Sequence, residues 1–320
     1  MKPAPKMTNK KNPAKKPVPK TSSKIKTVLC LRTCKADHTS HNKFTWPSKI
    51  GSLVEAADFD PAPVCGKGLH GLLWGEGAYN LLDWSPEAIW QVVEVEEKTL
   101  VDLDGKVKFP KCKLVFEGDQ KTATDYLQLR APNGKVIHGA FVTVGHNQTA
   151  TAGNYGHATA GDYGHATAGD YGQATAGDGG QATAGDGGQA TAGDGGHATA
   201  GDYGHATAGD GGHATAGDDG HATAGDDGHA TAGNYGTATA GVGGQTTAGD
   251  YGQATAGNYG HATAGNYGTA TAGDDGIITI KYWDEAAQRY RFLTGYIGET
   301  GLEPNVAYKV ENGSFVKVRA

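Results

Sequence analysis

The chain has 320 residues, of which 52 are glycine and 37% are hydrophobic. This is too little apolar material for one enzyme-like core that fills the whole chain, and no run approaches the roughly eighteen apolar residues of a transmembrane helix. The net charge of −6 is unevenly distributed, because residues 1–26 carry nine lysines and no acidic residue, whereas residues 145–276 carry fourteen aspartates and no lysine, arginine or glutamate.

Residues 1–26 form a basic tail of mainly Lys, Pro, Ala, Ser and Thr. With few apolar side chains to bury, this segment cannot offset the entropy lost on ordering, and we expect it to be disordered. It lacks the apolar region of a secretory signal, which favours a cytoplasmic protein without membrane contact. A solubilising leader is the favoured interpretation, and contact with nucleic acid is expected only through this tail.

Residues 27–136 have a mixed composition and are expected to form a small α+β domain. The expected strands are Thr27–Thr33, Ala88–Glu96, Leu100–Asp104, Lys106–Phe109 and Lys113–Glu117, followed by a short helix over Gln120–Arg130. Asp104-Gly105 is a hairpin signal between two of these strands.

The glycine-rich run Cys65–Tyr79 is the most unusual part of this domain. Tight turns around core Leu, Trp and His are the favoured interpretation. Its glycines and His70 resemble loop-and-strand motifs of ADP-ribosyltransferase-like folds, which would imply an enzyme in residues 27–136, although no matching catalytic glutamate motif is present. The domain also resembles N-terminal modules of unknown chemistry in phage and bacterial repeat proteins.

The four cysteines are candidate zinc ligands, together with His38, His41 or His70. Cys30 and Cys34 would lie about 13 Å apart along a strand, which is a poor spacing for one metal ion. Buried free thiols are the favoured interpretation for Cys30, Cys34, Cys65 and Cys112. We therefore expect neither a metal nor a cofactor.

From Gly153 to Gly276 the chain repeats every eight residues, as G-(D/N)-(Y/G/D)-G-(H/Q/T)-A-T-A, in sixteen units. The G-D-Y-G part is typical of a turn, because glycine accepts positive φ and Asp or Asn tolerates the left-handed region. The H-A-T-A part is typical of a short strand, in which His and Thr share one face and both alanines share the other. A short fixed period of this kind indicates a repeat architecture.

The third residue of each unit shows that the true repeat is closer to sixteen residues than to eight. On one register tyrosine fills six of eight sites, whereas on the other it fills two of eight. One edge should therefore carry a stacked tyrosine ladder, and the other should carry mainly glycine and aspartate. The ladder residues are Tyr155, Tyr171, Tyr203, Tyr235, Tyr251 and Tyr267.

These patterns predict a mainly β protein built on a parallel β-solenoid of 16-residue coils with alanines inside. Sixteen units give about eight coils and a rod roughly 38 Å long at about 4.8 Å per coil. A serpentine antiparallel sheet and a disordered linker are the alternatives. The antiparallel sheet would leave its alanine face exposed to water. A disordered linker would not need to keep A-T-A at the same position in every unit.

The outward strand face carries His165, His197, His213, His229, His261, Thr167, Thr199, Thr215 and Thr231. His197, His213 and His229 should lie on consecutive coils, where three imidazoles would bind a transition metal or respond to pH. Glutamine replaces histidine at equivalent positions and is a poor metal ligand. A solvated polar face is therefore the favoured interpretation.

Aspartates are expected to form acidic rows along the edges of the rod. The representative residues are Asp162, Asp178, Asp194, Asp210 and Asp226. Turn formation and solubility are the favoured explanations. The alternatives are an acidic decoy that mimics nucleic acid for a DNA-binding protein, and calcium binding between turns.

The octad A-G-D-Y-G-H-A-T resembles the octapeptide repeat of bacterial ice-nucleation proteins, over residues 145–280. The resemblance implies a β-solenoid with a tyrosine ladder and outward threonine arrays. This sequence departs from it in one respect, because His or Gln mostly replaces the first threonine of Thr-x-Thr. Both threonines are kept at Thr149/Thr151, Thr237/Thr239 and Thr269/Thr271.

The ends of the repeat are expected to be sealed by larger apolar residues. Residues 137–144 keep the octad pattern with bulky side chains and should cap the first coil, and Ile277–Ile280 should do the same at the far end. We expect the solenoid domain to cover residues 137–280 and a C-terminal β cap to cover residues 281–320. The expected strands of the C-terminal part are Ile278–Trp283, Arg289–Tyr296, Val306–Val310 and Ser314–Val318.

The sequence thus favours a non-enzymatic binding or structural protein that presents its patterned solenoid to a macromolecular partner. A protein partner or a second copy is expected along the tyrosine edge or the C-terminal cap. An acidic decoy, an ice-binding or ice-nucleating surface and an enzyme in residues 27–136 are the alternatives.

Overall fold

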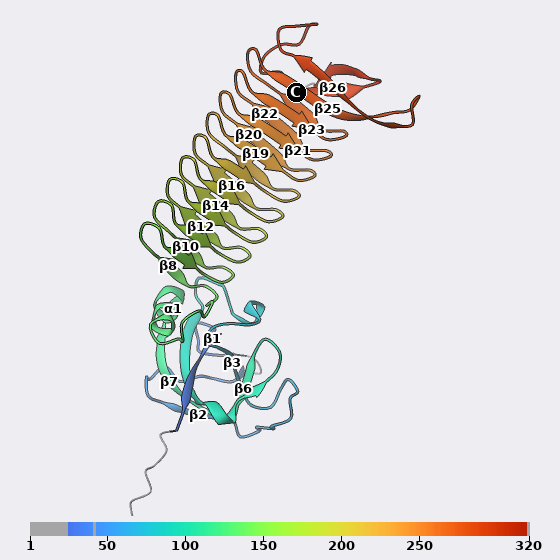
Figure 1. Ribbon diagram of the computed structural model, residues 1–320. Coiled ribbons are helices and arrows are strands. Elements are labelled where there is room, and N and C mark those ends of the chain that lie inside the picture. The colour runs from blue at the N-terminus through green and yellow to red at the C-terminus, as the bar shows by residue number, and fades with distance from the viewer. Residues whose placement is uncertain (1–24, 41–42, 319–320) are drawn as a thin grey trace, which may run out of the picture.

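The computed structural model describes residues 25–40 and 43–318, and it is mainly β. Figure 1 shows an N-terminal domain that carries helix α1, a long rod of stacked coils and a β-rich C-terminal end. The predicted disordered tail lies almost entirely outside the described residues. Across the described residues, no helix combines the length and the hydropathy that a bilayer-spanning segment needs.

The N-terminal domain is built on a seven-stranded antiparallel sheet with the order β2-β7-β4-β1-β3-β6-β5. Its strands are β1 (Thr27–Cys34), β2 (Leu53–Glu55), β3 (Leu69–Leu73), β4 (Ile89–Glu96), β5 (Val101–Asp102), β6 (Val107–Phe109) and β7 (Lys111–Gly118). Two 3-10 helices, η2 (Tyr79–Leu81) and η3 (Glu97–Thr99), lie in its loops. Helix α1 (Gln120–Gln128) has Asp119 as its N-cap residue. The Asp119 side chain accepts a hydrogen bond from the Thr122 N–H and so satisfies one free donor of the first helical turn.

Two of these strands, β2 and β3, were not expected from the sequence. Strand β3 lies inside the glycine-rich run that was interpreted as tight turns, and it pairs with β1 and β6. Gly71 is needed there for space, because a Cβ atom would lie 3.0 Å from the Cys30 Cβ and 3.2 Å from the Leu31 carbonyl oxygen. Gly71 thus permits close strand packing, whereas the glycines on either side of β3 have positive φ, which suits turns.

The repeat region forms a parallel β-solenoid with 16-residue coils, as predicted (Figure 1). Alternate strands stack into two parallel sheets, which we call the even sheet and the odd sheet. The even sheet contains β8 (Phe141–Thr143), β10 (His157–Thr159), β12 (Gln173–Ala176), β14 (Gln189–Ala192), β16 (His205–Ala208), β18 (His221–Thr223), β20 (Thr237–Ala240), β22 (Gln253–Ala256) and β24 (Thr269–Thr271). The odd sheet contains β9 (Thr149–Thr151), β11 (His165–Thr167), β13 (Gln181–Thr183), β15 (His197–Thr199), β17 (His213–Thr215), β19 (His229–Ala232), β21 (Gln245–Ala248), β23 (His261–Ala264) and β25 (Ile277–Asp284).

The solenoid has about nine coils rather than the eight expected. The difference arises at the N-terminal end, where residues 137–152 add two octads to the sixteen that begin at Gly153. Phe141 pairs in register with His157, and Ile277 pairs in register with His261. These segments therefore continue the two sheets as strands while their larger side chains close the core.

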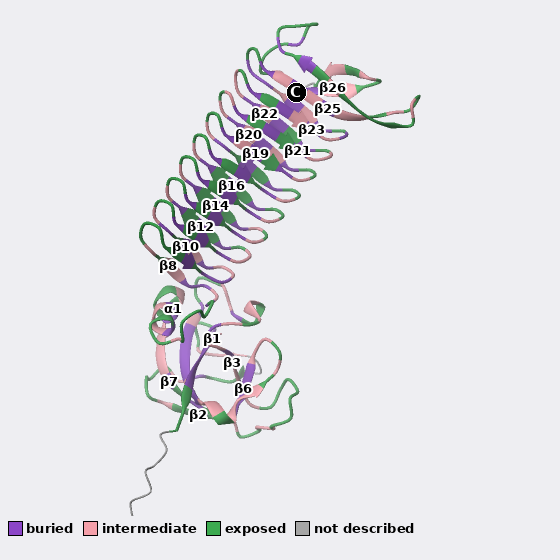
Figure 2. Cartoon of the chain, viewed as in Figure 1, coloured by how far each residue is buried: buried purple, intermediate pink, exposed green. Residues whose placement is uncertain are grey.

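The interior of the rod is filled by alanine methyl groups. Figure 2 shows buried and exposed residues alternating along the coils, and the alanines from Ala150 to Ala272 are at most 5% exposed. Thr246 replaces one alanine, and its buried hydroxyl lies 3.4 Å from the His261 carbonyl oxygen, to which it donates a hydrogen bond. The strand pattern thus places His and Thr outside and Ala inside, as the period of two requires.

The turns differ from the expected use of glycine. Positive φ falls on the third residue of each unit, such as Tyr203 at 58° or Gly211 at 64°, and not on the two constant glycines. The constant glycines are required by space instead. A Cβ atom on Gly204 would lie 2.8 Å from the Ala200 Cβ and 2.9 Å from the Gly201 carbonyl oxygen.

The C-terminal part closes the far end of the rod with antiparallel strands. β26 (Arg289–Tyr296) pairs with β25 at the end of the odd sheet, and β27 (Tyr308–Glu311) and β28 (Ser314–Lys317) extend the even sheet. Ile278, Ile280, Leu302 and Tyr308 are buried and belong to the same core as the last alanines. Larger side chains thus replace methyl groups where the stack of coils ends.

Candidate functional site

Each outer face of the solenoid carries one unbroken row of threonines. On the odd sheet the register aligns Thr151, Thr167, Thr183, Thr199, Thr215, Thr231, Thr247, Thr263 and Thr279. On the even sheet it aligns Thr143, Thr159, Thr175, Thr191, Thr207, Thr223, Thr239, Thr255 and Thr271. Because neighbouring parallel strands lie about 4.8 Å apart, each row is a regular array of hydroxyl and methyl groups.

The four threonines named from the sequence as outward-facing all belong to the odd sheet. The threonine of the H-A-T-A pattern recurs in every unit, so the pattern also predicts the equivalent row of the even sheet. Both flat faces of the rod therefore carry the same feature, on opposite sides of the alanine core.

Histidine and glutamine form a second row beside the threonines. On the odd sheet His197, His213 and His229 stack face to face, with ring centroids 4.8 and 4.7 Å apart. His165 and His261 are separated from this stack by Gln181 and Gln245. Partial burial, together with the neighbouring imidazoles, lowers the pKa of His213.

Among the described residues, no group of three or more His, Cys, Asp or Glu is arranged to hold a metal ion. Cys30, Cys34 and Cys112 are buried free thiols, whereas Cys65 is exposed, contrary to expectation. His41, another proposed ligand, lies outside the described residues.

The predicted tyrosine residues lie on one edge, in the turns that lead from the odd sheet to the even sheet. Tyr155 stacks on Tyr171 with ring centroids 5.1 Å apart, and Tyr251 stacks between Tyr235 and Tyr267 at 5.0 and 5.1 Å. The ladder is not continuous, because Gly187 and Asp219 interrupt it on either side of Tyr203. The stacked tyrosines therefore form two separate groups, one at each end of the rod.

The second residue of each unit has a structural role that was not predicted from the sequence. One side-chain oxygen of Asp or Asn accepts a hydrogen bond from the backbone N–H of the equivalent residue one coil later. The Asp194 N–H donates to Asp178 Oδ1 at 3.1 Å, and the Asp210 N–H donates to Asp194 Oδ1 at 3.0 Å. Such ladders run along both edges and account for the D/N preference. The five aspartates named from sequence, Asp162, Asp178, Asp194, Asp210 and Asp226, all lie on the edge opposite the tyrosines.

The N-terminal domain docks on the first coil through His138. Its Nδ1 accepts a hydrogen bond from the Asn154 N–H at 3.1 Å and so replaces the carboxylate at the start of one ladder. Its Nε2 lies 2.9 Å from the Gly77 carbonyl oxygen, to which only a protonated nitrogen can donate. This arrangement requires the neutral ring. Trp84 stacks on Tyr155 nearby, with ring centroids 4.2 Å apart.

This junction should weaken in acid. Burial lowers the pKa of His138, and a second ring proton would remove the acceptor for the Asn154 N–H. The unfolded chain takes up this proton near the ordinary pKa of about 6.5, so stability falls as pH decreases through that value. We expect the midpoint of thermal unfolding to fall more between about pH 8 and pH 5 in the parent than in His138→Gln, whose amide does not titrate in this range. An equal fall in both proteins would contradict this role of His138.

Comparison with known proteins identifies relatives of one kind. The chain is 33% identical over 110 residues to an ice nucleation protein of Xanthomonas campestris pv. translucens, a match that covers 34% of this chain and 7% of that protein. It is 31% identical over 102 residues to ice nucleation protein InaU of Pantoea ananas, covering 31% and 10% of the two chains. It is 33% identical over 108 residues to an ice nucleation protein of Pseudomonas syringae, covering 33% and 9%.

These proteins are homologues over about a third of this chain. The matches span only 7 to 10% of the length of these relatives. No family model matches the chain, and no solved structure is detectably similar to it.

Proposed function

We propose that the solenoid is a non-enzymatic ice-binding surface, and that its two threonine rows are the binding elements. The observation that carries the proposal is the unbroken row of nine threonines on each flat face. The relatives named ice nucleation proteins support the same assignment.

The threonine rows suit this role because each side chain offers a hydroxyl group and a methyl group at a fixed spacing. The hydroxyl groups can hold ordered water by hydrogen bonds, and the methyl groups exclude water that does not fit the lattice. β-branched side chains are also stiff about χ1, so the array loses little entropy when water orders on it.

The row beside the threonines limits the regularity of this surface. Histidine or glutamine stands where a second threonine would complete the pair, except on a few coils such as those of Thr149 and Thr237. We therefore propose a surface that binds ice along single rows. Changing the histidines of three consecutive coils to threonine should improve it.

The test compares ice recrystallisation and the freezing temperature of droplets for three variants. In the first, Thr199, Thr215 and Thr231 are changed to lysine, which covers the middle of one row with charged side chains. We expect the activity of that face to be lost and total activity to fall about twofold, because the even sheet keeps its row. In the second, His197, His213 and His229 are changed to threonine, and we expect activity to rise above that of the parent.

The control variant carries lysine at Tyr203, Asp219 and Tyr235, which are exposed turn residues on the tyrosine edge. All variants should keep the circular dichroism spectrum of the parent. If the threonine-to-lysine variant inhibits ice growth as well as the control does, the proposal is wrong.

The exposed tyrosines favour a second candidate, which is a protein partner or a second copy along the tyrosine edge. Tyr203, Tyr235 and Tyr267 are 62 to 68% exposed, and tyrosine is enriched at protein interfaces. The same variants distinguish the two candidates, because the control changes this edge and leaves both threonine rows intact. Loss of self-association only in the control would support this second candidate.

A further inference from the structure

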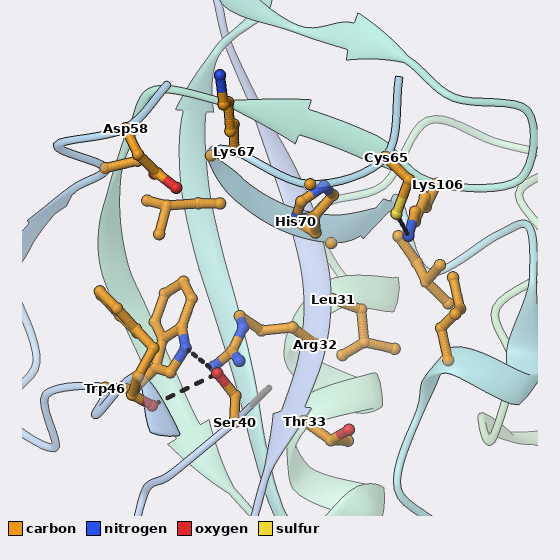
Figure 3. A pocket seen from close by; sticks show the side chains of 18 of the residues that line it. Leu31, Arg32, Thr33, Ser40, Trp46, Asp58, Cys65, Lys67, His70 and Lys106 are labelled. Atoms are coloured by element: carbon orange, nitrogen blue, oxygen red, sulfur yellow. Dashed lines mark hydrogen bonds between the residues drawn. The ribbon is translucent and has the colours of Figure 1, made fainter. Parts of the chain in front are cut away.

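The N-terminal domain encloses a cavity of about 870 Å³ that the proposed function of the solenoid does not use. It lies between β1, β3 and the loop residues Ser40, Lys43–Trp46, Ala56–Asp58 and Cys65–Gly68. Figure 3 shows Arg32 and His70 in its middle, between Trp46 on one side and Cys65 and Lys106 on the other. This volume is within the range of small-molecule sites, about 300 to 1,000 Å³.

The cavity carries an excess of positive charge. Its described lining includes Arg32, Lys43, Lys67 and Lys106, against a single carboxylate from Asp58. Burial lowers the pKa of His70, and the nearby Lys106 and Lys108 lower it further, so this ring stays neutral at physiological pH. Lys67 Nζ also lies 3.9 Å from Asp60 Oδ2 outside the lining, so with Cys65 as a neutral thiol the site is left with about two uncompensated positive charges.

Arg32 is the deepest of these cations. It is 7% exposed, and its guanidinium lies 3.4 Å from the centroid of the Trp46 ring. One nitrogen donates to the Gln91 side chain, which in turn donates to Glu117 at 2.7 Å, so no carboxylate contacts Arg32 directly. The Nε atom has no partner among the described residues. A buried guanidinium that has no carboxylate partner and a free Nε–H can donate charge-assisted hydrogen bonds to an anion.

A second unpartnered atom lies on the other side of the cavity. The His70 Nε2 is buried and has no hydrogen-bond partner among the described residues. Close to it, the Cys65 sulfur lies 3.0 Å from Lys106 Nζ, and this ammonium group lowers the pKa of the thiol. Buried polar atoms are normally paired, so two unpaired atoms in one cavity indicate a missing ligand.

We propose that this cavity binds a small organic phosphate. The phosphoryl group would lie between Arg32 and the lysines, and the organic body would lie against the apolar wall formed by Phe44, Leu72 and Leu82. A phosphate group, with about two negative charges, matches the excess positive charge. A single carboxylate would leave one charge unbalanced.

Cys65 provides a built-in probe for the test. The other three cysteines are buried, so iodoacetamide should modify Cys65 alone in the folded full-length chain. We expect saturating ADP, used as the probe molecule, to slow this alkylation about tenfold, because it covers the thiol and competes for Lys106. Adenosine and inorganic phosphate, each alone at the same concentration, should protect much less.

Calorimetric titration with ADP tests the residues themselves. The double variant Lys43→Gln/Lys67→Gln should weaken binding about tenfold for each charge-assisted hydrogen bond that it removes, and Arg32→Gln should abolish it. Arg32 is part of the folded core, so the double variant, which changes loop residues, is the deciding one. Lys111→Gln, which removes a β7 lysine paired with Glu55 outside the cavity, is the matched control and should bind ADP like the parent.

Four results would overturn the proposal. They are equal protection by adenosine, equal protection by inorganic phosphate, ADP binding that the double variant leaves unchanged, and failure of ADP to bind or protect at millimolar concentration. None of these results bears on ice binding by the solenoid.

Discussion

Replacing Gly212 with alanine is expected to destabilise the solenoid by about 3 kcal/mol, the upper end of the usual range for overpacking. A Cβ atom at this position would lie 2.8 Å from the Ala208 Cβ and 2.9 Å from the carbonyl oxygens of Gly196 and Gly209. Two of these three neighbours are backbone atoms held by the ladders of adjacent coils, so they cannot move without disturbing the stack. Gly212 therefore has to remain without a side chain.

Gly211 is the matched control for this prediction. It has φ of 64°, and a Cβ atom there would meet nothing within 4 Å. Alanine at this position should cost only about 1 kcal/mol, the penalty of the left-handed region, and tyrosine already occupies equivalent positions such as 203. Denaturant unfolding followed by circular dichroism would measure both variants. Equal destabilisation by the two replacements would show that steric exclusion at Gly212 is not the cause.

Asp210→Ala is expected to destabilise the rod by about 2 kcal/mol, because it removes the acceptor for the Asp226 N–H. That hydrogen bond is 2.9 Å long and links two consecutive coils. Asp210→Asn keeps an acceptor oxygen and removes one charge from a row in which carboxylates repeat about every 4.8 Å. This second variant should therefore be as stable as the parent or slightly more stable at neutral pH and low salt.

Val242 stands where every other unit carries the Asp or Asn of these hydrogen-bond ladders, and it allows the converse experiment. The Val242 N–H donates a hydrogen bond to Asp226 Oδ1 at 2.8 Å, as on other coils. The valine side chain, however, has no oxygen that could accept a hydrogen bond from the Asn258 N–H. Val242→Asn should stabilise the rod by about 1 kcal/mol, since one more coil-to-coil hydrogen bond can form. Thermal unfolding of the three ladder variants would check these expectations. A neutral effect of Asp210→Ala would remove the structural explanation of the D/N preference.

Local periodicity is what made the repeat predictable. The alternation of Ala with His and Thr identified the buried face, and the parity of the tyrosines identified the 16-residue coil. Counting sixteen units from Gly153 gives only eight coils, because Phe141 and its bulky neighbours obscure the octad before that glycine. Strand β3 is hard to recognise for another reason, since its single glycine, Gly71, serves close packing between strands within a run that is otherwise rich in turn glycines.

The threonine rows and the N-terminal cavity also differ in how far the sequence predicts them. Both threonine rows are visible in the sequence, because the threonine of the H-A-T-A pattern recurs in every unit. The anionic-ligand site was not visible, because it combines Arg32 of β1, the loop that carries Cys65 and Lys106 near β6. The order β2-β7-β4-β1-β3-β6-β5 brings these segments together, and no local pattern predicts that order.

The sequence by itself determined the solenoid: its coil length, its alanine core, its outward threonines and the edge on which most tyrosines lie. Each of these follows from the short period of the repeat, since every coil contacts only neighbours of nearly the same sequence. Only the tertiary structure shows why the constant glycines are needed and where the N-terminal cavity forms. It also shows that the aspartates of the ladders accept hydrogen bonds from the backbone of the next coil. These hydrogen bonds join residues sixteen apart, the cavity joins segments that are farther apart still, and a Cβ atom on a constant glycine such as Gly204 would meet both its own turn and the preceding coil. All three therefore depend on how coils and strands are placed in space.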